Sequence, residues 1–432
     1  MVIALWRKAG LDEAELVYSG SILQLYPAIA EGLTACLSQA LPRLRVVSPR
    51  GTAADGAVSL AMRLFAPVDG LTMERTNGRD PIIIRPMQSA DVPRLTAIFN
   101  RSVQVGDIPC LPLTEKAFTE AMAGENGHVL AALDAHGTPV GFSSVCVEPG
   151  KPAGAWLTML MVSVKSQRQG IGSALLRRAM KQARELGADC LRVSPTNPVS
   201  LGWTLPRTVH VEHNCMPGIL QRSVGCRWLQ RHGFETLGSL QVMYRPLQTW
   251  HPDDAALETE CERMLTMGVR VGLWTPDCGT EIDTLCDHVG NEYWRHVLCS
   301  ELRAHAENQP NADPALWPDG VRPQGPRPLI VAVAEGRIVG FTGPVDVQKN
   351  GRGWFTGICV DPDYGRRGIG RLMFRLLLRQ LKAAGAAYVT LYTGEDNPAR
   401  HIYEGEGLKR NSIFHIMRLP LQEAAPSTEE QA

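Results

Sequence analysis

Short apolar stretches alternate with polar turns along most of the chain, and one succession of them occurs twice. Apolar residues recur with a helical period near Asp91 and over Ile171–Leu186. The first copy also predicts strands, at Ile82–Arg85, Val129–Leu133, Pro139–Val147, Ala155–Val164 and Cys190–Val193. This order of strand, helix, three antiparallel strands, helix and strand indicates an α/β fold with one crossover connection.

The second copy repeats that order, with Gly172 and Gly370 in equivalent places 198 residues apart. Its predicted elements are a strand at Gly268–Pro276, helices within Glu281–Ala306, strands at Leu329–Ala334, Ile338–Val347 and Trp354–Val360, a helix at Arg371–Ala384 and a strand at Tyr388–Thr393. An internal repeat of this kind predicts two tandem α/β (α+β) domains with mixed, mainly antiparallel sheets.

Each repeated unit contains an apolar strand, a glycine-rich turn and an amphipathic helix. The turns carry Gly170 and Gly172 in the first copy, and Gly368 and Gly370 in the second. Glycines let the backbone approach a ligand closely, and the helix start behind them offers unpaired amides and the positive end of its dipole. Three arginines add charge to the second turn: Arg366, Arg367 and Arg371. We expect a pyrophosphate there.

Residues 1–66 belong to neither copy and predict a small α/β fragment. The expected elements are strands at Leu16–Leu23 and Arg45–Ser48 and helices at Tyr26–Leu41 and Ala53–Leu64. With the turn Ser19-Gly20-Ser21, this piece resembles the C-terminal end of BadF-type N-acetylglucosamine kinases and ATPases. The resemblance implies that the phosphate-binding hairpins and catalytic aspartate would lie upstream of Met1, so we expect no kinase chemistry.

The remaining boundaries follow from composition. Residues 67–81 are rich in Pro, Gly and Asp and predict a linker. We place the first repeated domain at 82–248, the second at 249–420, and a solvated, acidic, disordered tail at 421–432.

Composition narrows the class of protein. The 432 residues include 44 basic and 44 acidic side chains, so total charge points to neither nucleic acid nor an anionic membrane. No uncharged apolar run is long enough to span a bilayer, and the N-terminus does not read as a signal peptide. The 11 cysteines include no Cys-x-x-Cys pair and predict reduced thiols. We therefore expect a cytoplasmic location; the oligomeric state is open.

The glycine turns resemble the coenzyme A-binding motif of the GNAT (GCN5-related) N-acetyltransferases, in which Gln or Arg stands three residues before Gly-x-Gly or Gly-x-Ala. Gln167 fits this position in the first copy, whereas the second copy has Gly365. The resemblance implies acetyl-coenzyme A as co-substrate, no metal, and these binding residues: Val162, Gln167, Arg168, Gln169, Gly170 and Gly172 in the first copy, and Ile358, Cys359, Val360, Gly365, Arg366, Arg367, Gly368, Ile369, Gly370 and Asn397 in the second.

A second family feature lies downstream of the second turn. Asn397 follows the strand after the motif helix, and Tyr403 stands four residues before Gly407. The resemblance implies that Asn397 binds the pantetheine amides, that Tyr403 protonates the departing thiolate, and that a backbone amide near Gly357 to Cys359 polarises the acyl carbonyl. The alternatives are a helix cap for Asn397 and simple aromatic packing for Tyr403.

The first copy departs from this pattern. Leu229 stands where the second copy has Tyr403, and leucine cannot donate a proton. The first copy also carries about 24 extra residues before this segment, rich in Pro, Gly and His, which we expect as a loop near its acyl pocket. The copy is expected to be degenerate and to bind coenzyme A without catalysis; the alternative is that solvent or another residue acts as the acid.

Other chemistry-bearing residues give weaker signals. No general base can be assigned among Glu395, Asp396, His401 and His415. Cys359 is a candidate nucleophile or a buried apolar residue. The cluster Cys278, Cys286, His288, His296 and Cys299 lacks the spacing of a zinc site. Tyr293 and Trp294 are expected either to line the acceptor pocket or to pack in the core.

The sequence therefore predicts an acyltransferase that moves an acetyl group from acetyl-coenzyme A to a primary amine of a small-molecule acceptor, with its second domain active. We expect neither nucleic acid nor membrane as a partner. One alternative is a non-catalytic acyl-coenzyme A sensor or scaffold. Another is remnant sugar kinase activity in residues 1–66.

Overall fold

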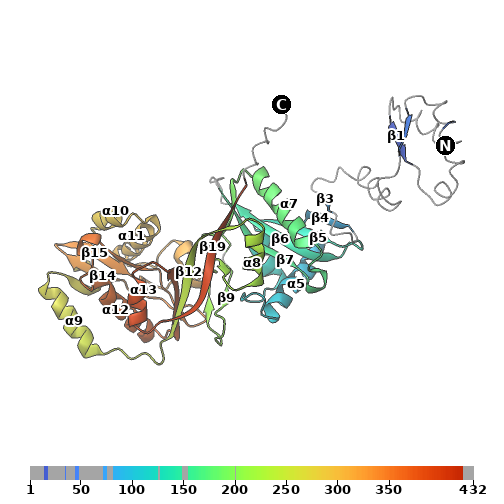
Figure 1. Ribbon diagram of the computed structural model, residues 1–432. Helices are drawn as coiled ribbons and strands as arrows, with labels where there is room; N and C mark the ends of the chain where they lie inside the picture. The colour runs from blue at the N-terminus through green and yellow to red at the C-terminus, as the bar shows by residue number, and fades with distance from the viewer. Residues whose placement is uncertain are drawn as a thin grey trace.

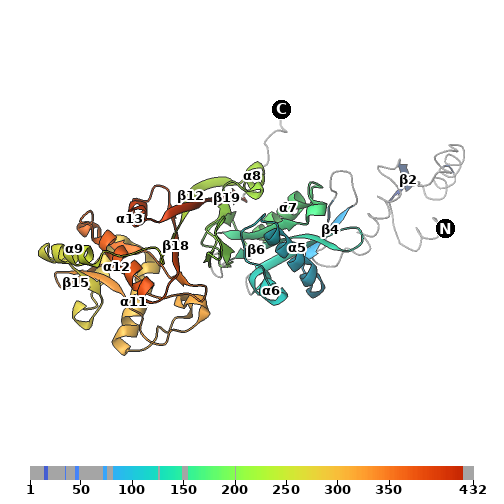
Figure 2. The ribbon, with the colours of Figure 1, turned by 90° about the horizontal axis from the view of Figure 1, so that it is seen from below.

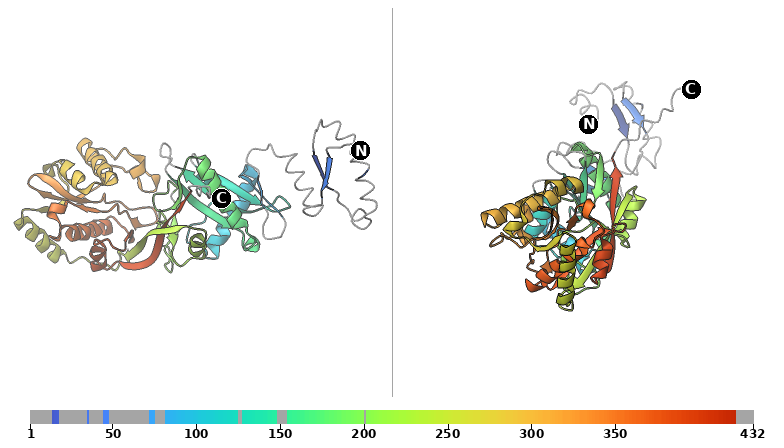
Figure 3. Two further views of the ribbon diagram at one scale, coloured as in Figure 1. Left: turned by 45° about the horizontal axis from the view of Figure 1, so that its top comes forward. Right: turned by 90° about the vertical axis from the view of Figure 1, so that its left-hand side faces the viewer.

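The computed structural model describes residues 81–124, 127–147, 154–199 and 201–421, with the backbone of residues 14–17, 35, 44–47 and 72–74. Two repeated halves, which we call the N-terminal half (82–246) and the C-terminal half (254–421), lie next to one another along the long axis of the molecule (Figures 1 and 3). No helix in these described ranges is long and apolar enough to cross a membrane.

The N-terminal half places helices on both faces of a sheet. Its elements are β4 (Ile82–Pro86), α5 (Val92–Gln104), α6 (Glu115–Ala123), β5 (Gly127–Leu133), β6 (Pro139–Val147), β7 (Ala155–Val162), α7 (Ile171–Glu185), β8 (Cys190–Val193), β9 (Trp203–Thr204), β10 (Glu212–His213), β11 (Ile219–Leu220), α8 (Val224–Arg231) and β12 (Glu235–Pro246). Helices α5 and α6 bury Phe99 and Phe118 against one face, and α7 buries Leu176 on the other (Figures 1 and 2).

The C-terminal half repeats this layering. Its elements are α9 (Asp254–Thr266), β13 (Arg270–Leu273), α10 (Asp283–Val289), α11 (Glu292–Glu307), β14 (Ile330–Ala334), β15 (Arg337–Thr342), β16 (Arg352–Gly353), β17 (Ile358–Val360), α12 (Ile369–Ala383), β18 (Tyr388–Gly394), α13 (Arg400–Gly405) and β19 (Lys409–Pro420). The apolar face of α12, including Leu377 and Leu381, fills the core on one side, whereas α10 and α11 cover the other.

The two halves exchange their last strands. Strand β19 lies between β12 and β8, pairing Pro420 with Cys190, and β12 in turn pairs Pro246 with Tyr388 of β18. The amide of Leu421 continues the pairing by donating to the Asp189 carbonyl at 2.7 Å. Each half is therefore completed by the final strand of the other, and one sheet in the order β16-β18-β12-β19-β8-β7-β6-β5-β4-β3 runs through both.

The predicted fold class is confirmed: the structure is a mixed α/β arrangement with two tandem units. Gly170 and Gly368 occupy the same place, each capping a 15-residue helix in the left-handed conformation, with φ of 86° and 89°. The predicted strand Trp354–Val360 is shorter, because the chain leaves β16 at Gly353 and pairs again only from Ile358 as β17.

The segments before the first half are described only in part. Strand β3 (Thr72–Glu74) lies inside the predicted linker and pairs with β4. Strands β1 (Ala14–Val17) and β2 (Leu44–Val47) form a parallel pair that overlaps the two strands expected in residues 1–66. The expected helices of that piece, its Ser19-Gly20-Ser21 turn and the tail at 422–432 lie outside the described residues, as does most of the kinase resemblance.

Candidate functional site

The glycine turn of the C-terminal half presents a run of consecutive unpaired amides. After β17, a short 3₁₀ turn at Pro362–Tyr364 leads to Arg366 and Gly368, which both have positive φ, and α12 begins at Ile369. Within the described residues, the amides from Arg366 to Arg371 have no hydrogen-bond acceptor. Such a concave run of amides at a helix start is suited to an anion.

Side chains around this turn are basic and partly fixed in place. Arg367 lies over the Tyr364 ring, with its guanidinium carbon 4.8 Å from the ring centroid, and donates to the Asp363 carbonyl at 2.9 Å. Arg366 is exposed and adopts φ of 59°, a conformation that is uncommon for residues other than glycine. Arg366 thus carries a positive charge on a residue whose own amide is among the free donors.

Gly365, where the family motif has Gln or Arg, is explained by crowding. Its amide donates to the Pro362 carbonyl at 3.0 Å, and a Cβ at this position would lie 2.9 Å from the same oxygen. In the N-terminal half the corresponding bond, from Gln167 to the Val164 carbonyl, is longer at 3.4 Å. The tighter turn of the C-terminal half therefore disfavours a side chain at residue 365.

Asp361 stabilises the start of the turn through hydrogen bonds to its buried carboxylate. Its fully buried carboxylate accepts hydrogen bonds from His288 Nδ1 at 2.9 Å, Arg337 at 3.0 Å and the Asp363 amide at 3.1 Å. Burial acts to raise the pKa of Asp361, but these donors outweigh it and lower the pKa below its usual value. His288, Asp361 and Asp363 bring three possible metal-ligand atoms within 4.8 Å of one another, yet Arg337 already compensates the buried charge.

The chain segment before the glycine turn consists of β16 and β17. It starts next to β18 and then separates from it, and we call this segment and β18 the diverging strands. Strand β16 pairs with β18 through Arg352 and Gly353, whereas β17 pairs only with β15 of the second sheet. In the described chain, the amides of the connecting residues Phe355, Thr356 and Gly357 have no acceptor. The separation leaves these donors free in the segment where the resemblance implies that an acyl carbonyl is polarised.

Trp294 holds the diverging segment in position. Its indole Nε1 donates to the Thr356 carbonyl at 3.0 Å, and the Thr356 hydroxyl donates to the Gly343 carbonyl at 2.5 Å. Gly357 has φ of 132°, and a Cβ there would lie 2.7 Å from the Trp294 ring, so only glycine fits. Of the two predicted pocket residues on α11, Trp294 therefore shapes this segment, while Tyr293 is 51% exposed.

Tyr403 is an aromatic core residue with an unused hydroxyl. Its ring packs edge-on against Phe374, with centroids 5.0 Å apart, and against Phe355, at 5.8 Å. Burial raises the pKa of Tyr403 to about 12. The hydroxyl has no hydrogen-bond partner among the described residues. Aromatic packing, the alternative role of Tyr403, therefore explains the position of the ring but gives the hydroxyl no function.

Asn397 lies in the exposed turn after β18 and accepts a hydrogen bond from the next turn of the chain. Its Oδ1 accepts from the Ala399 amide at 3.0 Å, and its own amide donates to the Gly394 carbonyl at 3.2 Å. The expected helix cap is not formed, because the N-cap of α13 is Ala399 and no side chain caps that helix. The side-chain Nδ2 makes no hydrogen bond to any residue that the structure describes, which leaves a donor for a ligand.

The N-terminal half retains the glycine turn. The amides from Arg168 to Ser173 have no acceptor among the described residues, and Gln167 Nε2 donates to the Val162 carbonyl at 3.1 Å. Gln169 donates to the Lys165 carbonyl at 3.3 Å. The glycine turn of the N-terminal half thus offers an anion the same run of free amides as the turn of the C-terminal half.

Its diverging strands, in contrast, are bridged by side chains. Trp156 Nε1 donates to Ser194 Oγ at 3.0 Å, and Asn197 Nδ2 donates to Thr158 Oγ1 at 3.2 Å. Leu229 is buried in the half's core, at the place of Tyr403. Asn197 was missed by the sequence reasoning, although the dipeptide Asn-Pro, at 197–198 and again at 397–398, could have identified it.

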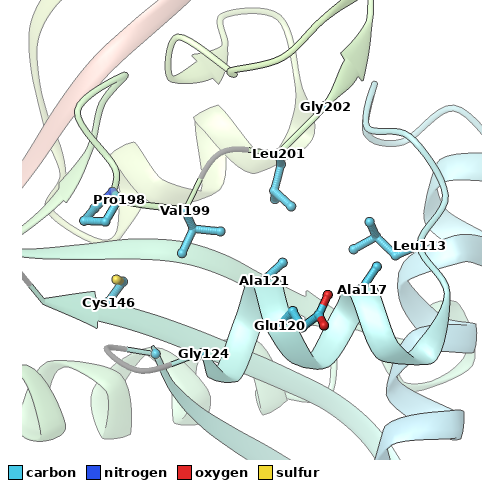
Figure 4. Close-up of a pocket in the computed structure, with 11 residues that line it drawn as sticks. Leu113, Ala117, Glu120, Ala121, Gly124, Cys146, Pro198, Val199, Leu201 and Gly202 are labelled. Carbon is cyan, nitrogen blue, oxygen red and sulfur yellow. The ribbon is translucent and has the colours of Figure 1, made fainter. Parts of the chain in front are cut away.

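A pocket of about 490 Å³ opens beside the bridged strands of the N-terminal half (Figure 4). Helix α6 forms one wall with Ala117, Glu120 and Ala121, and Val199 and Leu201 face it from the segment after β8. The lining side chains are apolar apart from the Glu120 carboxylate, and polar and apolar atoms contribute about equally to the lining surface. The pocket adjoins the turn at Pro198, next to the hydrogen bond between Asn197 and Thr158.

The inserted loop of the N-terminal half contacts the C-terminal half. Strands β9 and β10 form a hairpin, and the buried Arg352 of β16 donates to His213 Nε2 at 3.1 Å and to Asn214 Oδ1 at 3.4 Å. Cys215 Sγ lies 3.4 Å from the Tyr392 hydroxyl of β18. The expectation that the loop lines its own half's acyl pocket missed this contact, which depends on the exchanged strands.

Glu395 and Asp396 directly follow β18 and Cys359 lies on β17, whereas the two histidine candidates are already paired. His415 is on β19, with Nδ1 3.0 Å from Ser239 Oγ, and His401 is exposed beside Glu404. Burial raises the pKa of the Cys359 thiol to about 12, which makes it a poor nucleophile. Cys278 and Cys286 are buried in the core under α10, while His296 pairs with Asp313 at 2.5 Å.

The chain is similar in sequence to known proteins. The model of the Acetyltransferase (GNAT) family matches residues 94–203 and 292–407. A mycothiol acetyltransferase of Geodermatophilus obscurus is 29% identical over 315 residues, which cover 70% of this chain and 86% of the relative.

Solved structures match the fold. A fungal glucosamine N-acetyltransferase region within a multi-domain GH3 β-N-acetylglucosaminidase superposes with a TM-score of 0.54 and 17% identity, covering 94% of this chain. This chain spans 49% of that fungal chain. A tandem GNAT protein from the clavulanic acid biosynthesis pathway is covered over its full length, with 14% identity and a TM-score of 0.45. Since the family model covers both repeated halves, the chain belongs to the acetyltransferase (GNAT) family and is an acyltransferase.

Proposed function

We propose that the C-terminal half transfers an acetyl group from acetyl-coenzyme A to the primary amine of a small-molecule acceptor. One contrast between the halves carries this proposal. The C-terminal half places the unpartnered Tyr403 hydroxyl beside diverging strands, and no hydrogen bond joins Thr356 to Asn397. The equivalent residues of the N-terminal half, Thr158 and Asn197, bond to each other, and Leu229 replaces the tyrosine.

The residues of the C-terminal half fit acetyl-coenzyme A. The free amides from Arg366 to Arg371 and the guanidinium of Arg366 suit a pyrophosphate. The Nδ2 of Asn397 and the edge of β17 supply polar partners for the pantetheine amides. Residues proposed to hold the co-substrate are Ile358, Cys359, Val360, Gly365, Arg366, Arg367, Gly368, Ile369, Gly370 and Asn397.

When bound, acetyl-coenzyme A supplies a thioester that an amine can attack. The amides of Phe355 to Gly357 donate to the carbonyl oxygen as negative charge develops on it. Tyr403 then gives its proton to the departing sulfur as the carbon–sulfur bond breaks, and the proton that the attacking amine loses passes to water, from which Tyr403 is reprotonated. Because burial raises the pKa of Tyr403 to about 12, its hydroxyl carries a proton throughout the neutral pH range. An acid that stays protonated suits this role.

The acceptor is proposed to enter from the side of α11. Trp294 and Tyr293 lie there, and the inserted loop of the N-terminal half reaches the same face of β18 through Cys215. One relative is named for mycothiol and one structural neighbour for glucosamine. A small amine of comparable size is therefore the class to test first.

The experiment uses the full chain with acetyl-coenzyme A and a panel of amines that includes aminosugars. Product is detected as a mass increase of one acetyl group, and free thiol is measured in parallel. We expect at least one amine to be acetylated with equal release of thiol. If acetyl-coenzyme A binds but no amine is converted, the protein is a sensor or scaffold rather than an enzyme of this activity.

For the N-terminal half we propose binding of acyl-coenzyme A without transfer, because its free amides are retained but its strands are bridged. The proposed contacts are Val162, Gln167, Arg168, Gln169, Gly170 and Gly172. Arg168 and Arg366 form a matched pair, since both have φ of 59°. Aspartate tolerates this conformation, so Arg366→Asp should raise the KM for acetyl-coenzyme A about tenfold, whereas Arg168→Asp should leave turnover unchanged. The reverse result would place catalysis in the N-terminal half.

A further inference from the structure

Helix α9 brings a fourth arginine to the glycine turn of the C-terminal half. A Cβ built on Gly368 would lie 3.4 Å from a terminal nitrogen of Arg263 and 3.3 Å from the Met264 methyl group. The guanidinium of Arg263 thus sits beside the residue that caps α12. Arg263 lies on the first helix of the C-terminal half and is not part of the glycine motif.

The position of α9 is fixed by its packing on α12. Leu257 and Met264 are buried in the core that α12 dominates. Glu260 pairs with Arg375 at 3.0 Å, and Asp254 pairs with Arg379 at 3.4 Å. These contacts hold the whole length of α9 along α12, so the place of Arg263 beside the turn is set by the fold.

Among the described residues, most of the positive charge at this turn has no acidic partner. The contact found for Arg263 within the described residues is a donation from Nη1 to the neutral sulfur of Met267, at 3.5 Å. Arg366 has no acidic partner there, and Arg367 donates to a carbonyl. Arg371 lies 3.8 Å from Glu406, which also pairs with Arg375. Like charges held together repel one another, so an anion would stabilise the group.

We propose that Arg263 is a cofactor-binding residue whose guanidinium binds the pyrophosphate of acetyl-coenzyme A at the turn Gly365–Gly370. This inference rests on the proposed function of the C-terminal half. It also accounts for the loss of a side chain at Gly365: crowding against Pro362 excludes Gln or Arg there, and α9 supplies the missing donor from outside the motif.

The test compares Arg263→Gln with the wild-type full chain by titration with coenzyme A and with dephospho-coenzyme A, which lacks the 3′-phosphate. We expect the Kd for both ligands to rise by a similar factor, about tenfold, because both carry the pyrophosphate. The KM for acetyl-coenzyme A should rise equally while kcat stays within about twofold. Arg94→Gln, which removes an exposed arginine of α5, is the matched control and should change neither constant.

Each other outcome overturns the inference. A Kd that rises for coenzyme A alone would assign Arg263 to the 3′-phosphate instead. Unchanged constants in Arg263→Gln, with a higher Kd in Arg366→Asp, would leave the proposed function standing and remove only Arg263. If neither variant changes binding while the wild type binds coenzyme A, the C-terminal turn is not the cofactor site and the proposed function fails as well. Circular dichroism and thermal unfolding should show that Arg263→Gln folds normally, since the side chain is exposed.

Discussion

Arg352 of the C-terminal half donates a hydrogen bond to Nε2 of His213 in the N-terminal half, at 3.1 Å, and both side chains are buried. The other guanidinium hydrogens of Arg352 are taken by Thr390, Gln348 and Asn214. Burial, with the Arg352 charge, lowers the pKa of His213 well below its usual value. The contact between the halves therefore requires a neutral histidine.

This requirement predicts a pH dependence of stability. The unfolded chain binds a proton on His213 near its ordinary pKa of 6.5, whereas the folded chain does not. The stabilisation is thus present above that pH and is lost as the pH falls below it. We expect the melting temperature to drop between about pH 7.5 and 5.5, and to drop less in His213→Gln, whose amide oxygen can accept from Arg352.

The alanine variant completes this experiment. His213→Ala leaves a buried Arg352 donor without an acceptor, so it should lower the free energy of unfolding by about 1–3 kcal/mol at pH 7.5. Urea denaturation at that pH measures the difference. If His213→Gln and the wild type keep the same pH dependence, another group controls acid stability.

Tyr403→Phe should lower kcat much more than it changes the affinity for acetyl-coenzyme A. The ring contacts with Phe374 and Phe355 remain, so only the proton donor is lost. General acids contribute about 10² to 10⁴ in rate, and we expect a loss at the lower end of that range. Steady-state kinetics with a titration of acetyl-coenzyme A separates the two effects.

Leu229→Met is the matched control for Tyr403→Phe, because it changes the equivalent buried position while keeping its volume. Turnover should stay within about twofold of the wild type. A comparable loss of kcat in both variants would contradict the division of roles between the halves.

The two Asn-Pro turns give a second matched pair. Asn397→Ala should raise the KM for acetyl-coenzyme A several-fold, since it removes the free Nδ2 donor as well as the hydrogen-bond acceptor of the Ala399 amide. Asn197→Ala should leave acetyl transfer unchanged, because Asn197 bonds to Thr158 within the N-terminal half. Equal effects on KM would show that both turns contact the reacting co-substrate.

The exchanged strands predict that core mutations act in the opposite half. Met417 of β19 is buried among residues of the N-terminal half, and Met243 of β12 among those of the C-terminal half. Replacing either by Ala should cost about 2–5 kcal/mol. Hydrogen exchange should quicken in α7 and β8 for Met417→Ala, and in α12 and β18 for Met243→Ala.

An increase in exchange confined to the half that carries the mutated residue in sequence would rule out this reciprocal packing. Thr266→Ala, at the exposed end of α9, serves as a control that should alter exchange only locally.

Much of the fold could be predicted from local patterns. The apolar periodicity located the repeated strands and helices, and the position of the glycines identified where α7 and α12 begin. These features depend on neighbouring residues along the chain. The exchange of β12 and β19 could not be predicted, because an apolar strand pattern does not specify which distant strand becomes its partner.

The candidate site residues were predicted from motif spacing, and their roles stay predictions. Gly368 lies before α12, Asn397 follows β18, and Tyr403 lies on α13. The approach of Arg263 depends on the docking of α9 against α12, which no local pattern predicts. The bridging of Thr158 by Asn197 likewise requires three-dimensional distances.

The exchange of β12 and β19 constrains how the two halves of the gene can evolve. If the gene were cut between the halves, each product would retain a final strand that fits the other product and would lack the strand that it needs for itself. Neither fragment could then evolve as an independent protein without first replacing a strand. An N-terminal copy without catalysis, as proposed above, would therefore be kept by selection, since losing it would remove a structural part of the other copy.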